Sequence, residues 1–314
     1  MTGPRRALRI LSAAALLAAS GLAAAACGQA GGDALGRGDR LLSRGEAGAA
    51  IAEYRLAERQ QGSQPRILAR LAHAYARQGD AETALQAYDR LLAADSSYRY
   101  QAAADLTAAA REAHERGNDN EMARLLEPMV SSGLDLVPAD LRVVLAGHDF
   151  EQGTYAEALP LLLSLPDSLL AEDPDARSRV LYETARSFEE LGGCEEALGY
   201  FRSYLDGVSG KGSAEANSAR WHFGNCLFTV AEGARQAGRD DAALTRLDSL
   251  VSVGVPRTLQ DRAQFMRGEI LLDGGRSAEA LEAFQAVLRL DPTRTGPVAR
   301  RAEERIREIR YGGD

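Results

Sequence analysis

The chain has 314 residues, a net charge of −8 and only 6% aromatic residues. Alanine and leucine dominate, whereas valine, isoleucine and threonine are sparse, and this composition favours helices over sheets. The 45 acidic residues outnumber the 37 basic ones, which argues against a nucleic-acid partner because phosphate contacts need a basic face.

Residues 1–26 have the pattern of a secretory signal peptide, with three arginines before a short, alanine-rich apolar run. The run ends at Cys27, and residues 22–27 resemble the lipobox of bacterial lipoproteins. The resemblance implies that Cys27 is lipidated and becomes the new N-terminus, with residues 27–33 as a short polar tether. Ala24 stands where the lipobox usually has leucine, so cleavage at an A-x-A site without lipidation stays an alternative.

Lipidation at Cys27 would hold the folded part close to a membrane. The expected location is the bacterial cell envelope, lipid-anchored on the periplasmic face. Gly28 after the cysteine matches the pattern for outer-membrane sorting in a cell with two membranes. Removal of residues 1–26, which hold three arginines and no acid, leaves 34 basic and 45 acidic residues, a charge of −11. Anionic lipid repels such a surface, so the membrane contact is expected through the N-terminal lipid.

A pattern with a period of about 34 residues recurs from residue 45 onward. A glycine is followed five residues later by alanine and nine residues later by a bulky side chain. The strong copies are Gly45-Ala50-Tyr54, Gly79-Ala84-Tyr88, Gly153-Ala158-Leu162, Gly192-Ala197-Phe201 and Gly275-Ala280-Phe284, the last followed by Pro292; Gly238-Ala243-Leu247 is weaker, and the copy at Gly117 has Met122 in place of alanine.

This pattern resembles the tetratricopeptide repeat, a helix–turn–helix unit of the same period. The resemblance covers residues 34–292 and implies an all-α, right-handed α-solenoid of about seven repeats. In each copy the glycine would end the first helix, and the alanine would lie where two helices cross closely. Residues 293–314 are expected to form a C-terminal capping helix, over 297–311, and a tail. One side of that helix is apolar and the other charged, as the end of a repeat array requires.

Two intervals between turn glycines exceed the period. The interval from Gly153 to Gly192 is longer by a few positions, and the interval from Gly192 to Gly238 is longer still. We assign the first excess to an additional loop at 166–173. Part of the second is assigned to a long helix over about 213–236, after a turn at 207–212.

The sequence also marks the starts of three helices. Asp173-Pro174 and Gly296-Pro297 are read as N-cap and N1 pairs, and Thr258 to Asp261 is read as a capping box.

The two remaining cysteines, Cys194 and Cys226, lie on either side of the turn near residue 210, equally far from it along the chain. Two antiparallel helices that meet at this turn would bring the cysteines level with each other. Export favours oxidation, so one interpretation is a disulfide that stiffens the array. The other interpretation is a pair of buried free thiols. Because no C-x-x-C motif is present, redox catalysis is not expected.

The sequence has no recognisable catalytic set. The four histidines lack metal-ligand spacing, and neighbouring acids on a helix do not face each other. A nucleophile elbow and a phosphate-binding glycine loop are both missing from the sequence. We therefore expect no enzymatic activity, no cofactor and no metal.

A stack of helix pairs offers an extended surface to a protein or peptide partner. The candidate groove residues are His73 and Arg77 on one first helix and Tyr182 with Arg186 on another. The hypothesis is a lipid-anchored scaffold for protein–protein interaction in the bacterial envelope, as an accessory of an assembly machine. The alternative is a periplasmic binding protein for a glycan or a peptidoglycan-related ligand, which would need more aromatic side chains on one face than the chain offers.

Overall fold

The computed structural model describes residues 34–208 and 213–312, and every regular element within these ranges is a helix. The expected all-α fold built from helix–turn–helix repeats is therefore confirmed. The signal peptide, Cys27, the tether at 27–33, most of the turn at 207–212 and the last two residues lie outside these ranges. Among the helices of the two ranges, none is long and apolar enough to cross a membrane.

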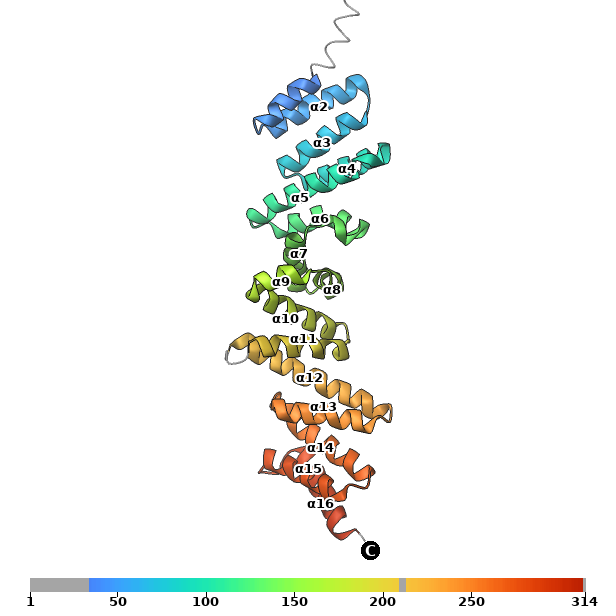
Figure 1. Cartoon of the computed structure of the whole chain (residues 1–314), viewed down its shortest axis with the longest axis vertical. Helices are drawn as coiled ribbons and strands as arrows, with labels where there is room; N and C mark the ends of the chain where they lie inside the picture. Colours follow the sequence, from blue (N-terminus) through green and yellow to red (C-terminus); the bar gives the residue numbers. More distant parts are fainter. Residues whose placement is uncertain (1–33, 209–212, 313–314) are drawn as a thin grey trace, which may run out of the picture. The chain divides into compact units, whose positions relative to one another are not determined.

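The chain divides into two compact units, with the boundary between Leu141 and Arg142. In unit 1 a helix at 34–43 is followed by further helices, which form successive pairs (Figure 1). They are α2 (Ala47–Gln61), α3 (Pro65–Gln78), α4 (Ala81–Ala94), the short 3₁₀ helix η1 (Ser96–Tyr98), α5 (Arg99–Glu115), α6 (Asp119–Ser132) and the 3₁₀ helix η2 (Leu134–Leu136).

The boundary falls within α7 (Ala139–Glu151), and the rest of unit 2 continues as helix pairs and a final single helix. The elements are α8 (Tyr155–Leu163), α9 (Asp167–Glu172), α10 (Pro174–Glu190), α11 (Cys194–Gly207), α12 (Ala214–Gln236), α13 (Asp240–Val253), α14 (Arg257–Asp273), α15 (Ser277–Leu290) and α16 (Pro297–Tyr311).

The repeat pattern marks the turn and the crossing of each helix pair. All seven glycines have a positive φ, between 69° and 84°, a conformation that a residue without Cβ adopts at little cost. The six alanines and Met122 are fully buried, and the bulky residues four positions later are at most 3% exposed. Each pair is therefore held by a small residue at the crossing and a large one beside it.

The structure adds a second small position, seven residues before each turn glycine, that the predicted pattern does not include. At Gly268 an added Cβ would lie 2.5 Å from Cε1 of Phe284, the bulky residue of the same repeat. Such a distance is far inside van der Waals contact, so the aromatic ring requires a small partner on the first helix. The seven buried members are Gly38, Ala72, Ala110, Ala146, Ala185, Ala231 and Gly268.

The predicted helix starts are confirmed at two places and wrong at one. Asp173 caps α10 by accepting hydrogen bonds from the backbone of Asp175 and Ala176, and Pro174 is its first residue. Gly296 and Pro297 have the same places in α16. The capping box at 258–261 is wrong, because α14 begins at Arg257 after Pro256 and its N-cap makes no side-chain hydrogen bond.

The predicted loop at 166–173 is also wrong in part. Six of its residues form the short helix α9, which follows the extended residue Pro166 and has Asp167 in its first turn. A carboxylate in the first turn is favourable beside the unpaired backbone N–H groups of a helix start. By contrast, the long helix predicted over 213–236 is α12, whose N-cap Ser213 accepts a hydrogen bond from the backbone N–H of Ala216.

Candidate functional site

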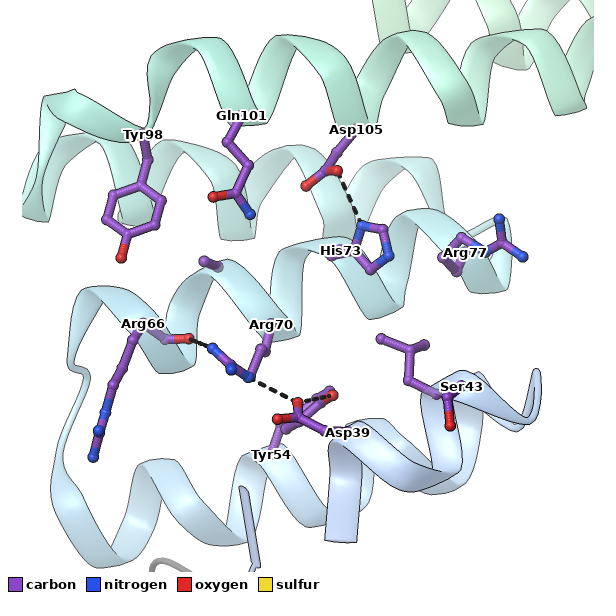
Figure 2. A pocket seen from close by; sticks show the side chains of 12 residues that line it. Asp39, Ser43, Tyr54, Arg66, Arg70, His73, Arg77, Tyr98, Gln101 and Asp105 are labelled. Atoms are coloured by element: carbon purple, nitrogen blue, oxygen red, sulfur yellow. Dashed lines mark hydrogen bonds and ion pairs between the residues drawn. The ribbon is translucent and has the colours of Figure 1, made fainter. Parts of the chain in front are cut away.

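Unit 1 contains a hollow of about 710 Å³ between its first helices. Its walls are the helix at 34–43, α3 and α5, with Tyr54 from α2 and Tyr98 from η1 at its margins (Figure 2). We call it the unit 1 pocket. Because the walls are the first members of three successive pairs, this is the surface on which the sequence predicts a groove.

The α3 wall is a stripe of long polar side chains. Arg66, Arg70, His73 and Arg77 follow one another at intervals of three or four residues, so they lie on one side of the helix. The opposite side carries the buried residues Leu68, Leu71, Ala72 and Tyr75. Packing of this apolar side against neighbouring helices turns the polar stripe toward the hollow, and the structure thereby places His73 and Arg77 in the pocket wall.

Asp39, on the helix at 34–43, forms hydrogen bonds that order one side of the pocket. Its Oδ1 accepts hydrogen bonds from Nε of Arg70 and from the hydroxyl of Tyr54, each at 2.8 Å. Burial of the phenol, together with the hydrogen bond to Asp39, raises the pKa of Tyr54 above its usual range. The Tyr54 hydroxyl is therefore a hydrogen-bond donor at neutral pH, and both groups hold the Asp39 carboxylate in a fixed orientation.

Asp105 has the same role on the α5 wall. Its Oδ1 lies 3.2 Å from Nδ1 of His73, and its Oδ2 accepts a hydrogen bond of 3.0 Å from the Tyr88 hydroxyl. Burial, reinforced by the nearby Asp105 carboxylate, raises the pKa of Tyr88 well above its usual range. The contact between His73 and Asp105 joins α3 to α5 and fixes the direction of the imidazole.

The remaining arginines of the stripe differ in their partners. Arg77 forms an ion pair of 2.8 Å with Glu112 of α5. Arg66 is exposed and donates a hydrogen bond of 2.9 Å to the side-chain oxygen of Gln61, but it forms no ion pair within residues 34–208 and 213–312. It is thus the arginine of the pocket with a charge left for a carboxylate from outside, since Arg70 and Arg77 are already paired.

The other two candidate groove residues, Tyr182 and Arg186, lie on α10 in unit 2. The Tyr182 hydroxyl is 3.2 Å from Oγ of Ser218, and its ring centroid lies 5.5 Å from that of Tyr204. The side chain of Arg186 is only 14% exposed and forms ion pairs of 2.6 Å with both Glu189 and Glu190. The contact of Tyr182 with Ser218 joins α10 to α12 of the next repeat, whereas the contact with Tyr204 lies within one helix pair and the ion pairs of Arg186 lie within α10. A part for either residue in ligand binding stays a prediction.

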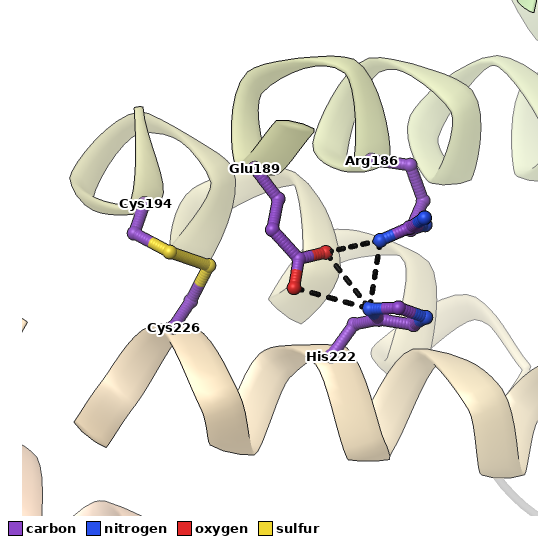
Figure 3. The surroundings of a disulfide bond; sticks show 5 residues. All are labelled: Arg186, Glu189, Cys194, His222 and Cys226. Atoms are coloured by element: carbon purple, nitrogen blue, oxygen red, sulfur yellow. Dashed lines mark hydrogen bonds and ion pairs between the residues drawn. A yellow bond between two sulfur atoms is a disulfide. The ribbon is translucent and has the colours of Figure 1, made fainter. Parts of the chain in front are cut away.

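His222 and the two cysteines lie close to Arg186 and Glu189 (Figure 3). Nδ1 of His222 is 2.7 Å from Nη1 of Arg186 and 2.9 Å from Oε2 of Glu189. Because a guanidinium only donates and a carboxylate only accepts, Nδ1 can hydrogen-bond to one of them at a time. Cys194 and Cys226 are joined by a disulfide with a Cα–Cα distance of 4.9 Å, and it connects α11 to α12.

In the part of the chain that the structure describes, no group of three histidine, cysteine or acidic side chains is placed to hold a metal ion. The charged groups of the unit 1 pocket are paired with one another or exposed, and they suit hydrogen bonding and charge pairing with a ligand.

Sequence reasoning did not single out Asp39, Arg66, Arg70 or Asp105, although a signal for one of them exists. Asp39 and His73 both lie six residues before a turn glycine, so they have the same position on successive first helices. Comparison of equivalent positions would have found Asp39. Which arginine each acid pairs with, Arg70 with Asp39 and Arg77 with Glu112, depends on how neighbouring repeats stack, and the pattern gives no signal for it.

Two segments of the chain match the model of a known repeat family. The model of the tetratricopeptide repeat family matches residues 35–99 and 231–295. No curated protein sequence matches the chain.

Solved structures of repeat proteins are also similar. Part of a repeat protein from Cytophaga hutchinsonii is 14% identical, with 85% of this chain and 98% of that chain covered and a TM-score of 0.35. A tetratricopeptide repeat protein from Parabacteroides merdae is 13% identical over 90% and 99%, with a TM-score of 0.33. The Pseudomonas aeruginosa protein pilF is 17% identical over 89% and 99%, with a TM-score of 0.30. At such identities and scores, no partner or activity is transferred from them.

Proposed function

Because the chain carries tetratricopeptide repeats, we propose that it is a non-catalytic scaffold that binds a protein partner through the unit 1 pocket. Repeats of this family bind proteins or peptides. The observation that carries the proposal is the polar stripe of α3, which faces a hollow of about 710 Å³ and includes Arg66 without a carboxylate partner in the described ranges.

The pocket suits an extended peptide segment with at least one carboxylate. Arg66 would pair with that carboxylate. Tyr98 of η1 and Gln101 of α5, which also line the pocket, would hydrogen-bond the peptide backbone, whose polar groups need partners once they leave water. The internal pairs Asp39–Arg70 and His73–Asp105 preorganise the walls, which lowers the entropic cost of binding.

A sugar ligand has less support, because stacking of a sugar ring needs an accessible aromatic face. Tyr54 is fully buried, with its ring against Gly38, which leaves Tyr98 as the available ring in the pocket wall. A glycan or peptidoglycan-related ligand is therefore the second candidate.

The proposed location follows from the N-terminal sequence, which resembles that of a lipoprotein. The scaffold would be exported, lipidated at Cys27 and held at the periplasmic face of a bacterial membrane, as an accessory of an assembly machine. Intact-mass analysis of the purified chain is expected to show an N-terminal acylated Cys27. A mature chain that begins elsewhere, or an unmodified Cys27, would contradict the anchor and leave the peptide pocket untouched.

Arg66→Glu is expected to reduce recovery of the protein partner from detergent-extracted envelopes at least tenfold, because it replaces the unpaired cation of the pocket by a like charge to the incoming carboxylate. The measurement is quantitative mass spectrometry of proteins that co-purify with the tagged full chain. The matched control is Arg59→Glu on α2, an exposed arginine outside the pocket, which should leave recovery within twofold. Equal recovery by both variants, or retention of a glycan with no protein, would refute the pocket assignment.

A further inference from the structure

A second hollow, of about 650 Å³, lies at the last helix pair of unit 2. Its lining comes from the end of α15, from Arg294 in the connecting segment and from α16, the two final helices of the chain (Figure 1). Leu288 and the buried Ile306 supply its apolar part. Because α15 is the second helix of its pair, this hollow is on a different kind of surface from the unit 1 pocket, which first helices line.

The charges of this hollow are strongly unbalanced. Its one acidic lining residue, Glu303, is already neutralised by an ion pair of 2.7 Å with Arg294. Three further arginines, Arg289, Arg307 and Arg310, are exposed and form no ion pair with any residue of the two described ranges. They gather around one concavity in a chain whose net charge is −8.

Local helix electrostatics explains these arginines only in part. Arg289 and Arg310 lie in the last turns of α15 and α16, where a cation interacts favourably with the helix dipole. Arg307 lies outside the last turn, and the dipole does not require that three cations converge. Exposed apolar groups accompany them, since Tyr311 in the lining is 77% exposed and the neighbouring Leu290 is 46% exposed.

We propose that this hollow, the C-terminal basic groove, docks an acidic linear peptide of a partner protein. Carboxylates of the peptide would pair with Arg289, Arg307 and Arg310, and one apolar side chain would pack on Leu288 and Ile306. Charge complementarity selects the acidic partner. The concave shape selects a peptide over a lipid surface, because a flat anionic bilayer cannot enter the hollow and is repelled by the acidic chain.

The test measures binding of a fluorescein-labelled ten-residue peptide of alternating glutamate and aspartate with two central leucines, by anisotropy with the full chain in detergent micelles. We expect it to bind at least tenfold more tightly than the same peptide with amides for all acids. Arg307→Gln/Arg310→Gln should weaken binding at least fivefold and reduce its salt dependence. The matched control is Arg239→Gln/Arg257→Gln, which removes two exposed arginines of unit 2 outside the groove and should change affinity less than twofold.

The variants also separate this groove from other sites. If Arg307→Gln/Arg310→Gln changes the thermal midpoint of the protein, Arg289→Gln on the α15 wall replaces it as the test. Arg289→Gln should also weaken binding of the acidic peptide. Arg59→Glu on α2, an exposed arginine outside both hollows, should leave binding of the acidic peptide unchanged. The variants that test this groove lie in α15 and α16, whereas the variant that tests the unit 1 pocket lies in α3, so the two proposals can fail separately.

Four results would overturn the proposal. The amide peptide could bind as tightly as the acidic one, or the control pair could lose as much affinity as the groove pair. The groove variants could lose affinity for micelles with added phosphatidylglycerol while the peptide still binds, which would assign the arginines to lipid. Sedimentation could show that the groove variants abolish self-association of the chain, which would assign the groove to binding of a second copy of the chain.

Discussion

Glu183→Gln is expected to stabilise unit 2 at pH 8 by up to about 3 kcal/mol and to have little effect near pH 4.5. Glu183 lies on α10 and is 8% exposed. Burial raises the pKa of its carboxyl from 4.5 to about 7; the nearby Arg179 opposes this rise in pKa, and Glu151 adds to it. The magnitude follows from the difference between these two pKa values, since a tenfold change in a proton-binding constant corresponds to about 1.36 kcal/mol.

The sign follows from proton linkage. The folded chain holds the Glu183 proton more tightly than the unfolded chain, so between pH 4.5 and 7 it binds more protons at this site. Stability therefore falls as the pH rises through this window. Glutamine carries no charge at any pH and is of similar size, so the variant loses this part of the pH dependence.

The measurement is urea unfolding of the wild type and the variant at pH 4.5, 6 and 8, followed by helical circular dichroism. The control is Glu196→Gln on α11, an exposed glutamate, which should change the free energy of unfolding by less than about 0.5 kcal/mol at each pH. A difference between Glu183→Gln and wild type that stays constant from pH 4.5 to 8 would contradict the account of a buried, ionising carboxyl.

Replacement of the cysteine pair, Cys194→Ala/Cys226→Ala, is expected to destabilise unit 2 by about 2–4 kcal/mol. The bond connects positions 32 residues apart, so its loss releases a loop of that length in the unfolded chain. Because α11 and α12 belong to unit 2, the unfolding transition of unit 1 should not move. The measurement is urea unfolding under oxidising conditions, resolved into two transitions where the units unfold separately.

Reduction of the wild-type protein is the matched control, since it breaks the same bond without a substitution. Reduced wild type and the double variant should unfold at similar urea concentrations, and addition of dithiothreitol should leave the variant unchanged. If oxidised wild type and the double variant are equally stable, the disulfide does not form in the protein or does not stabilise it.

The repeat architecture could be predicted because its signals are local. A turn glycine with positive φ, an alanine five residues later and a bulky residue nine later describe one helix pair almost completely. The Asp173 and Ser213 caps are short-range hydrogen bonds of the same kind. The position of Cys194 relative to Cys226 also follows from helix lengths around one turn.

Less of the candidate site could be predicted, because ion pairing depends on how repeats stack. His73 and Arg77 can be placed on a first helix from the pattern, but the pairs that they form with Asp105 and Glu112 join separate helices, α3 and α5. Arg186 is a different case, because its charge is used within α10 by Glu189 and Glu190, three and four residues further along the same helix. The convergence of arginines at the C-terminal basic groove likewise requires the crossing of α15 and α16.

The central claim is that the unit 1 pocket holds a protein partner in the cell, and in-cell photo-crosslinking tests it most directly. A photo-reactive phenylalanine derivative at Gln101, an exposed residue of the pocket wall, should form one defined protein adduct. The same derivative at Gln60, an exposed residue of α2 outside the pocket, should form none, and Arg66→Glu should abolish the adduct at Gln101. Absence of an adduct at Gln101, or the same adduct from both positions, would contradict the claim.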